Sequence, residues 1–316
     1  MTRYFAFAKE ASFNPPSPPT TPTRWLEISS EDISLDQQYV YVETVRERAY
    51  RHRLDGPQAI SGSIDTPAFP GSAMTLLYYT LGSVTTTGTA DPYTHTITPG
   101  NTIPSFSSWI GVEEYVSGGP IVMERKYNGM AISGVDIDYS AGEMLTLSFD
   151  VIAAKEATPG TTLQSPTFAS DRPFSANDVV VTLGGSPSTV VESVSISIDN
   201  NIADDAFAIG SRILPALIVG RREITGSMDL RFASRDEYNN FLSGTTRSLV
   251  LDATIGANRQ FKITLPKISY DTSNANIDTM ERVVQGVDFT ALWDDTSGYD
   301  IQIVVKNGDS NTQFVG

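Results

Sequence analysis

The feature that most constrains the fold is a passage that occurs twice. Residues 56–65 read Gly-Pro-Gln-Ala-Ile-Ser-Gly-Ser-Ile-Asp, and residues 220–229 read Gly-Arg-Arg-Glu-Ile-Thr-Gly-Ser-Met-Asp. Upstream, Ile-Ser-Leu-Asp at 33–36 matches Ile-Ser-Ile-Asp at 196–199. Downstream, each copy has a short helical stretch that ends in glycine, at Gly82 and at Gly244, and then an alternating segment that carries Phe-Asp at 149–150 or Val-Asp at 287–288. Landmarks in the same order and at similar spacing predict a duplicated domain.

Composition narrows the class of protein. The 316 residues are enough for two domains of ordinary size, and the net charge of −15 excludes the basic footprint that attracts nucleic acid. The absence of cysteine excludes disulfides, thiolate zinc sites and cysteine nucleophiles. The longest apolar run, residues 213–219, is too short to span a bilayer, and the N-terminus does not resemble a signal peptide. We therefore expect a protein of the cytoplasm, or one that leaves the cell inside a larger particle.

Local patterns predict an all-β fold with one short helix per domain. Period-two alternation runs through residues 129–154, 193–200 and 223–232, and residues 39–45 form an extended segment rich in β-formers. Residues 70–82 read as a helix with Ser72 as its N-cap, and residues 234–244 as a second helix that opens with a capping-box spacing. A final short strand is expected over residues 300–306.

These patterns suggest four segments. Residues 1–23 are expected to form an extended Pro-rich arm whose Tyr4, Phe5 and Phe7 dock on a neighbour, with a disordered tail as the alternative. Residues 24–155 form the first domain, with a long insertion at about 83–120. Residues 156–187 are a linker that could contain a strand at 179–181, and residues 188–316 form the second domain.

The insertion is the main difference between the two copies. Between the helix-ending glycine and the next matched strand, copy one is about 31 residues longer. Two copies that share the same core do not need connections of different length in order to fold. The longer segment of copy one is therefore the best candidate for a specialised contact. The candidates for this contact are Tyr93, His95, Phe106 and Trp109. Alternatively, the three aromatic side chains could form a sugar-binding platform or pack on what the segment covers, and His95 could pack or hydrogen-bond locally.

Catalytic and metal motifs find little support. No Gly-x-Ser-x-Gly elbow accompanies His95, and His52 lies in a basic stretch, residues 46–53, that suits either an acidic partner or a solvated loop. Asp136-x-Asp138 and the acids at 294, 295 and 300 lack the spacing of an EF-hand. No Walker loop, GxGxxG or zinc spacing occurs, and no carboxylate pair is singled out for glycosidase chemistry. We expect no enzyme activity, cofactor or metal.

The order of elements resembles a known family. An alternating strand (196–199), a long loop leading to residues 219–229, a short capped helix and paired strands resemble the major tail tube proteins of long-tailed, siphovirus-like viruses of bacteria and archaea. Within that family, the chain resembles the subgroup with two tube domains per chain. The resemblance implies tandem β-sandwich domains that add strands to a continuous inner β-barrel, in stacked trimeric rings with pseudo-six-fold symmetry. In such a stack we expect the insertion, residues 83–120, to contact a neighbouring ring through Tyr93, His95, Phe106 and Trp109.

The same resemblance implies partners and a location. The chain would assemble with itself in the host cytoplasm and end in the virion tail. There it would contact tail tip or baseplate, tape-measure and tail-terminator proteins, without membrane insertion. Genome DNA would pass through the tube during ejection without specific binding.

The acidic balance then acquires a role, because carboxylates on the wall of a conduit repel DNA. The acids that recur in both copies are the candidates for the lumen, namely Asp36 with Asp199, Asp65 with Asp229, and Asp150 with Asp288. The alternative is that these acids merely end strands.

Two other functions stay open at this stage. One is a β-sandwich adhesin or receptor-binding tail component that binds host glycans through the insertion. The other is a glycan-cleaving enzyme.

Overall fold

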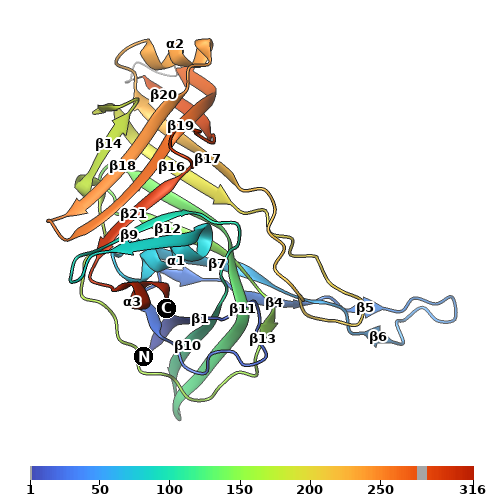
Figure 1. Ribbon diagram of the computed structural model, residues 1–316. Coiled ribbons are helices and arrows are strands. Elements are labelled where there is room, and N and C mark those ends of the chain that lie inside the picture. Colours follow the sequence, from blue (N-terminus) through green and yellow to red (C-terminus); the bar gives the residue numbers. More distant parts are fainter. Residues whose placement is uncertain (1, 276–282) are drawn as a thin grey trace.

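The chain is folded almost entirely into antiparallel β-structure (Figure 1). The computed structural model describes residues 2–275 and 283–316. The elements of the first half are β1 (Arg3–Lys9), β2 (Arg24–Leu26), β3 (Ser30–Glu31), β4 (Ser34–Gln37), β5 (Val40–Tyr41), β6 (Arg53–Leu54), β7 (Gln58–Pro67), α1 (Ser72–Leu81), β8 (Gly82–Thr87), β9 (Tyr93–Pro99), β10 (Phe106–Val116), β11 (Gly119–Ser140), β12 (Thr146–Ala153) and β13 (Lys155–Glu156).

The second half continues in the same style. Its elements are a 3-10 turn (Ala176–Asp178), β14 (Val179–Leu183), β15 (Ser186–Pro187), β16 (Val191–Asp199), β17 (Glu223–Arg231), α2 (Asp236–Ser243), β18 (Arg247–Ile255), β19 (Arg259–Ala275), β20 (Val284–Ala291), β21 (Gln302–Asn307) and α3 (Asn311–Val315). The expected all-β fold with few short helices is confirmed, as is the strand at 179–181. The final strand expected over residues 300–306 is observed as Gln302–Asn307.

One antiparallel sheet of eight strands runs through both halves. Its order is β4, β7, β12, β11, β16, β17, β20 and β19, with β3 extending the edge beside β7. Four strands come from each half, and they meet where residues 134–140 of β11 pair with residues 193–199 of β16. We call this contact the internal junction. One face of the sheet is apolar and supplies much of the core, including Phe149 and Val287.

The two halves share a strand plan down to its irregularities. A β-bulge after Ile132 in β11 recurs after Tyr270 in β19. A second bulge, between Tyr127 and Met130 of β11 where it pairs with β10, recurs between Leu265 and Ile268 of β19 where it pairs with β18. Bulges are local insertions that alternation does not produce. Their recurrence allows residues of the two halves to be matched one by one, with Phe149 corresponding to Val287.

The shared Gly-Ser-x-Asp motif has a steric cause. A Cβ atom on Gly62 would lie 2.5 Å from the Cα of Ile33 on β4's side of the sheet. A Cβ atom on Gly226 would lie 2.4 Å from the ring of Phe289 and 2.5 Å from the carbonyl oxygen of Ser195. Both glycines therefore allow a close approach of neighbouring strands. This is one reason why the motif stands in both copies.

The prediction of a free N-terminal arm is wrong for its first part. Residues 3–9 form β1, which pairs with β10, and the side chains of Tyr4, Phe5 and Phe7 are buried within the chain's own core. The carboxylate of Glu10 accepts hydrogen bonds from Ser105 Oγ (2.8 Å) and Ser107 Oγ (2.7 Å) and holds the end of this strand. In the second half, β14 pairs with β18 as β1 pairs with β10. The repeated unit thus includes residues of the expected N-terminal arm (1–23) and of the expected linker (156–187). The division into two domains stays a prediction.

The insertion of copy one makes its contacts within the same chain. Its hairpin β8–β9 pairs with β21, the strand near the C-terminus, and thereby joins the two halves. Helix α1 lies beneath this hairpin, and every residue from Ala73 to Leu81 is buried. Gly82 ends α1 and Gly244 ends α2 in the left-handed conformation, as predicted. The helix starts differ from expectation, because Gly71 and Arg235 hold the N-cap positions rather than Ser72 and Ser234.

A long arm leaves the body between β4 and β7 (Figure 1). It comprises residues 38–57 and contains the small hairpin β5–β6. Only Val40–Tyr41 of the segment expected as a strand over residues 39–45 forms one. The root of the arm is braced by the loop that connects β16 to β17, where Arg212 Nε donates to the Gly56 carbonyl (3.0 Å).

Candidate functional site

The six carboxylates that recur in both copies all lie on one face of the eight-stranded sheet. Residues directly opposite each other on paired strands share a face. Following these pairs across the sheet places on the same face Asp36, Asp65, Asp150, Asp199, Asp229 and Asp288. The sequence motifs thus identified the members of one surface, which we call the acidic face.

The acidic face contains more acids than the recurrence revealed. Asp136, Asp138 and Glu223 also belong to it, among many serine, threonine and glycine residues. The strand pairing also places Arg231, at the end of β17, on this face. Asp136 and Asp138 had been considered only as calcium ligands. Their alternation along β11 was the signal that could have assigned them to this face.

Hydroxyl groups hold several of these carboxylates in place. Ser30 Oγ donates to Asp65 Oδ2 (2.6 Å), and the corresponding Ser193 Oγ donates to Asp229 Oδ2 (2.8 Å). Asp65 also accepts from Ser148 Oγ (2.6 Å). Asp288 accepts from Thr272 Oγ1 (2.6 Å). These bonds orient the carboxylates without neutralising them, so the face keeps its negative charge.

Several carboxylates of this face are close enough to repel one another. A hollow of about 560 Å³ on this face is lined by Asp32, Asp136, Asp150 and Asp199, among others. Partial burial raises the pKa of the Asp150 carboxyl, and the negative charges of Asp136, Asp199, Asp32 and Asp65 raise it further. A surface of this kind repels anions. Among the residues that the structure describes, no three His, Asp or Glu side chains converge in a way that could hold a metal ion.

Both ends of the eight-stranded sheet are open edges. Within the described residues, β4 pairs only with β7, and residues 269–275 of β19 pair only with β20. Asp32 N donates to the Ser63 carbonyl in β7, and Gln38 N donates to the Pro57 carbonyl just before β7. The even-numbered residues of β4 therefore direct their N–H and C=O groups toward β7. The N–H and C=O groups of the odd-numbered Leu35 therefore point away from the sheet. Unpaired edges of this kind favour pairing with another chain.

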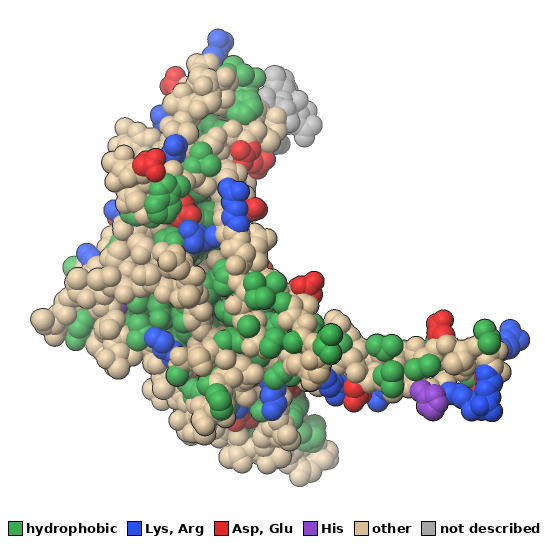
Figure 2. Space-filling model, turned by 45° about the vertical axis from the view of Figure 1, so that its right-hand side comes forward, with side chains coloured by type: hydrophobic (Ala, Val, Ile, Leu, Met, Phe, Trp, Pro, Cys, Tyr) green, Lys and Arg blue, Asp and Glu red, His purple; other side chains and the backbone are tan. Residues whose placement is uncertain are grey.

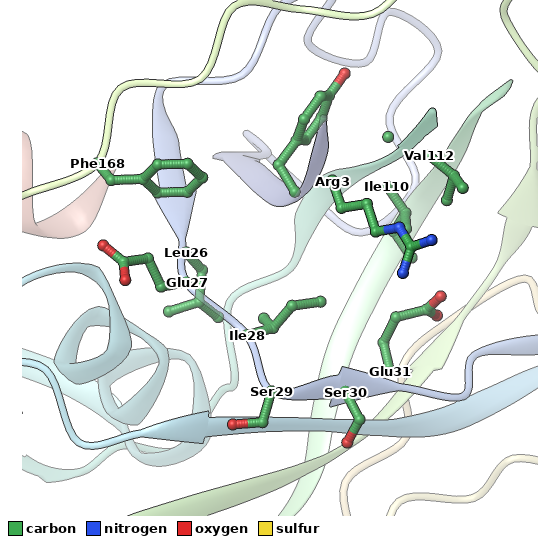
Figure 3. A pocket seen from close by; sticks show the side chains of 12 residues that line it. Arg3, Leu26, Glu27, Ile28, Ser29, Ser30, Glu31, Ile110, Val112 and Phe168 are labelled. Carbon is green, nitrogen blue, oxygen red and sulfur yellow. The ribbon is translucent and has the colours of Figure 1, made fainter. Parts of the chain in front are cut away.

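A large hollow lies next to the β4 edge (Figure 3). It measures about 630 Å³, and residues 26–31 form one wall, with Ile110 and Val112 of β10 and Phe168 around it. The corresponding wall in the second half, residues 191–194, borders a hollow of only about 160 Å³. That smaller hollow is closed by Tyr139, Ser140 and Ala141 at the end of β11. In the larger hollow, no described residue lies in the position that corresponds to Tyr139, Ser140 and Ala141.

The residues predicted to contact a neighbouring ring are mostly interior. His95 and Phe106 are fully buried and Trp109 is 2% exposed, whereas Tyr93 is partly exposed at the start of β9. His95 stacks on Phe314 at 3.8 Å between ring centroids, and its Nε2–H donates to Asn307 Oδ1 (3.0 Å). The expected contact role is therefore wrong for these three buried side chains. The partner of His95 is the C-terminal segment, about 200 residues away in the sequence, whereas Phe106 packs on Phe7 and Tyr79.

The arm is the element that reaches outward, and sequence reasoning missed it. Figure 2 shows it projecting from the body, with basic side chains and a histidine toward its outer part. Its apolar side chains are open to solvent, with Tyr41 52%, Val45 110% and Tyr50 62% exposed. The basic residues at 46, 48, 51 and 53 contrast with the net charge of −15 of the whole chain. The basic stretch around His52 was the available signal.

Comparison with known proteins gives one family. A family model described as phage tail tube protein matches residues 2–291. A search among curated proteins finds no match. In the described part of the chain, no helix has the length and apolar character needed to cross a membrane.

Proposed function

The chain belongs to the phage tail tube protein family, whose place is the virion tail, and from this premise we propose that three copies close into a ring and that the rings stack into a tube for genome delivery. The observation that carries the proposal is the eight-stranded sheet with one acidic face and two open edges. Ring closure satisfies both edges of every chain at once.

The register of the sheet supports closure. A row of opposed residues that begins at Ser30 crosses β7, β12 and β11 and reaches Ser197 in β16. The counterpart of Ser30 in the second half is Ser193, so the row has slipped by four residues over four strands. One residue per strand corresponds to a strand tilt of about 35°, at the lower end of the range of closed barrels. Three chains give 24 strands, and at this tilt the backbone diameter is about 45 Å.

The acidic face is the lumenal face in this proposal. Its apolar opposite face is covered by the remaining sheets and by α1, so the acidic face is the one left to line a channel. The lumen is wide enough for a DNA duplex. Carboxylates repel phosphates and thereby let the duplex slide. Each recurring pair, such as Asp150 with Asp288, contributes six charges to a ring of three chains.

The arm makes the contact between rings. It continues the direction of β4 and β7, and barrel strands run at about 35–45° to the barrel axis, so the arm leaves the ring through its rim. Its exposed tyrosines and arginines suit a neighbouring acidic ring. Replacing residues 42–52 by a short Gly-Ser turn should leave rings that no longer stack. Normal tubes from this variant would show that stacking uses another surface.

Electron microscopy and genome delivery together test the function. Purified protein at high concentration should form rings or hollow tubes in negative stain. Particles carrying Asp150→Lys and Asp288→Lys should assemble but deliver DNA slowly, most of all at low salt, because six new cations would bind phosphates. An adhesin would form neither rings nor tubes. Delivery at the normal rate would remove the role assigned to the acidic face.

A further inference from the structure

We infer that the contact between neighbouring chains repeats the internal junction, with β19 of one chain in the place of β11 and β4 of the next chain in the place of β16. The inference rests on the proposed ring and deepens it, because it assigns the pairing partner and the register. The partner is a second copy of this chain.

The internal junction provides the register. There, Asp136 opposes Ser197 and Val135 opposes Ile198. The shared bulge after Ile132 and Tyr270 matches Asp136 with Asn274. The Ile-Ser-x-Asp repeat matches Ser197 with Ser34. The contact between chains therefore places Asn274 opposite Ser34, and by the same step Ser273 opposite Leu35.

The backbone groups at the β4 edge point the right way for this pairing. Asn200 N donates to the Ser133 carbonyl at the internal junction (2.8 Å), which shows that even-numbered residues of β16 face β11. Their counterparts in β4 are the odd-numbered residues, Ile33, Leu35 and Gln37. These are the residues whose N–H and C=O groups point away from β7. Ile33 already has side-chain partners there, Glu31 and Arg125, so the main new ladder forms at Leu35 and Gln37.

The hollow beside β4 gives independent support. Residues 28–31 of its wall correspond to residues 191–194 of the smaller hollow, which the end of β11 closes. In a single chain nothing described plays that part at residues 28–31, and the hollow is about 630 Å³ instead of about 160 Å³. The end of the incoming β19 approaches this hollow when Asn274 opposes Ser34. The larger hollow thus lies at the edge where the neighbouring copy arrives.

Engineered cysteines test the register, because the chain has none of its own. Opposed residues of an antiparallel pair have Cα atoms about 4.5–5.5 Å apart, within the range that a disulfide bridges. The variant with Ser34→Cys and Asn274→Cys, both exposed in the single chain, should form covalent trimers when tubes are oxidised. The variant with Ser34→Cys and Thr272→Cys, which shifts one partner by two residues on the same face, should stay largely monomeric on a non-reducing gel.

A matched internal pair separates the possible failures. Asp136→Cys with Ser197→Cys should give a disulfide within one chain and leave assembly intact, which shows that opposed pairs on this face oxidise. If tubes form and this control oxidises while the Ser34/Asn274 variant does not, the register is overturned and the ring proposal stands. If the Thr272 variant cross-links as well as the Asn274 variant, the register is likewise wrong. If wild-type protein forms no rings, the proposed function fails with it.

Discussion

Helices α1 and α2 occupy corresponding places in the two halves, yet their environments are opposite. All residues of α1 from Ala73 to Leu81 are buried, whereas no residue of α2 is. The second half of the same chain covers α1: Tyr79 Oη donates to the Val315 carbonyl (2.9 Å), and Asn200 Nδ2 donates to the Thr80 carbonyl (3.0 Å). Leu242 of α2, the counterpart of Thr80, is 65% exposed.

The difference shows how one plan serves two contacts. Around α1, the contact between a first half and a second half is complete within the chain. Around α2 and the edge of β19, the corresponding contact is missing its partner in the single chain. Internal contacts should therefore govern the stability of the free chain, and their counterparts should govern assembly.

Proline at the two junctions should separate these roles most sharply. Ile198→Pro removes a ladder hydrogen bond in the middle of the sheet and alters a buried side chain, so we expect a loss of about 4–5 kcal/mol or more, enough to unfold the protein. Leu35→Pro removes an N–H that faces solvent in the free chain. It should cost about 1 kcal/mol and abolish ring formation. Urea unfolding and light scattering would measure the two effects, and equal destabilisation would contradict the comparison.

Truncations in the two helices should differ in the same sense. Leu77→Ala in α1 deletes a fully buried side chain and should destabilise the free chain by about 3 kcal/mol. Leu242→Ala in α2 should change stability by less than about 0.5 kcal/mol and weaken assembly instead. Thermal unfolding of dilute protein gives the first quantity, and the concentration needed for tube formation gives the second. A Leu242→Ala variant that assembles normally would leave α2 outside the contact.

The contact between β9 and β21, which includes the hydrogen bond from His95 to Asn307, should be sensitive to pH. Burial lowers the pKa of His95, so the unfolded chain takes up the proton more readily and the stability contributed by the neutral ring is lost as pH falls below about 6.5. His95→Ala should cost about 1–3 kcal/mol at pH 7, because Asn307 Oδ1 loses the Nε2–H donor of His95 and the ring no longer packs on Phe314. It should also flatten the pH dependence of stability between pH 7 and 5. Melting curves of both proteins across this range provide the check. An unchanged slope would mean that other groups cause it.

The smallest effect concerns the acidic face. The raised pKa of Asp150 means that its ionised form is disfavoured in the fold, so Asp150→Asn should stabilise the free chain at pH 7 by less than about 1 kcal/mol. The gain should diminish as the pH falls and the Asp150 carboxyl takes up a proton, and it should shrink at high salt. Asp288→Asn is the matched control and should not stabilise, because Thr272 donates to this carboxylate. A gain at Asp150 that persists in high salt would indicate a cause other than charge.

Sequence reasoning reached the acidic face because two independent regularities agreed there. Alternation with period two assigned side chains to faces, and recurrence of Asp36 as Asp199 or Asp65 as Asp229 marked positions that both copies keep. Helix ends at Gly82 and Gly244 were predictable for a local reason, since glycine adopts the left-handed conformation at low cost. These are properties of short segments.

The largest misses depend on partners far away in the chain. The proline-rich spacer after Tyr4 suggested an arm, but pairing with β10 about 100 residues away makes this segment a core strand. The insertion was read as a surface for a neighbour, whereas its partner is β21. No local sequence pattern distinguishes a strand that pairs within its own chain from one whose edge is left unpaired in the single chain. Composition likewise did not reveal that residues 38–57 form the projecting arm.

A reconstruction of assembled tubes by cryo-electron microscopy tests the ring most directly. We expect three-fold rings whose inner wall is a continuous sheet of 24 strands, with β19 of each chain beside β4 of the next and the acidic face toward the axis. A wall interrupted between chains, or one that turns Asp150 and Asp288 to the outside, would contradict it.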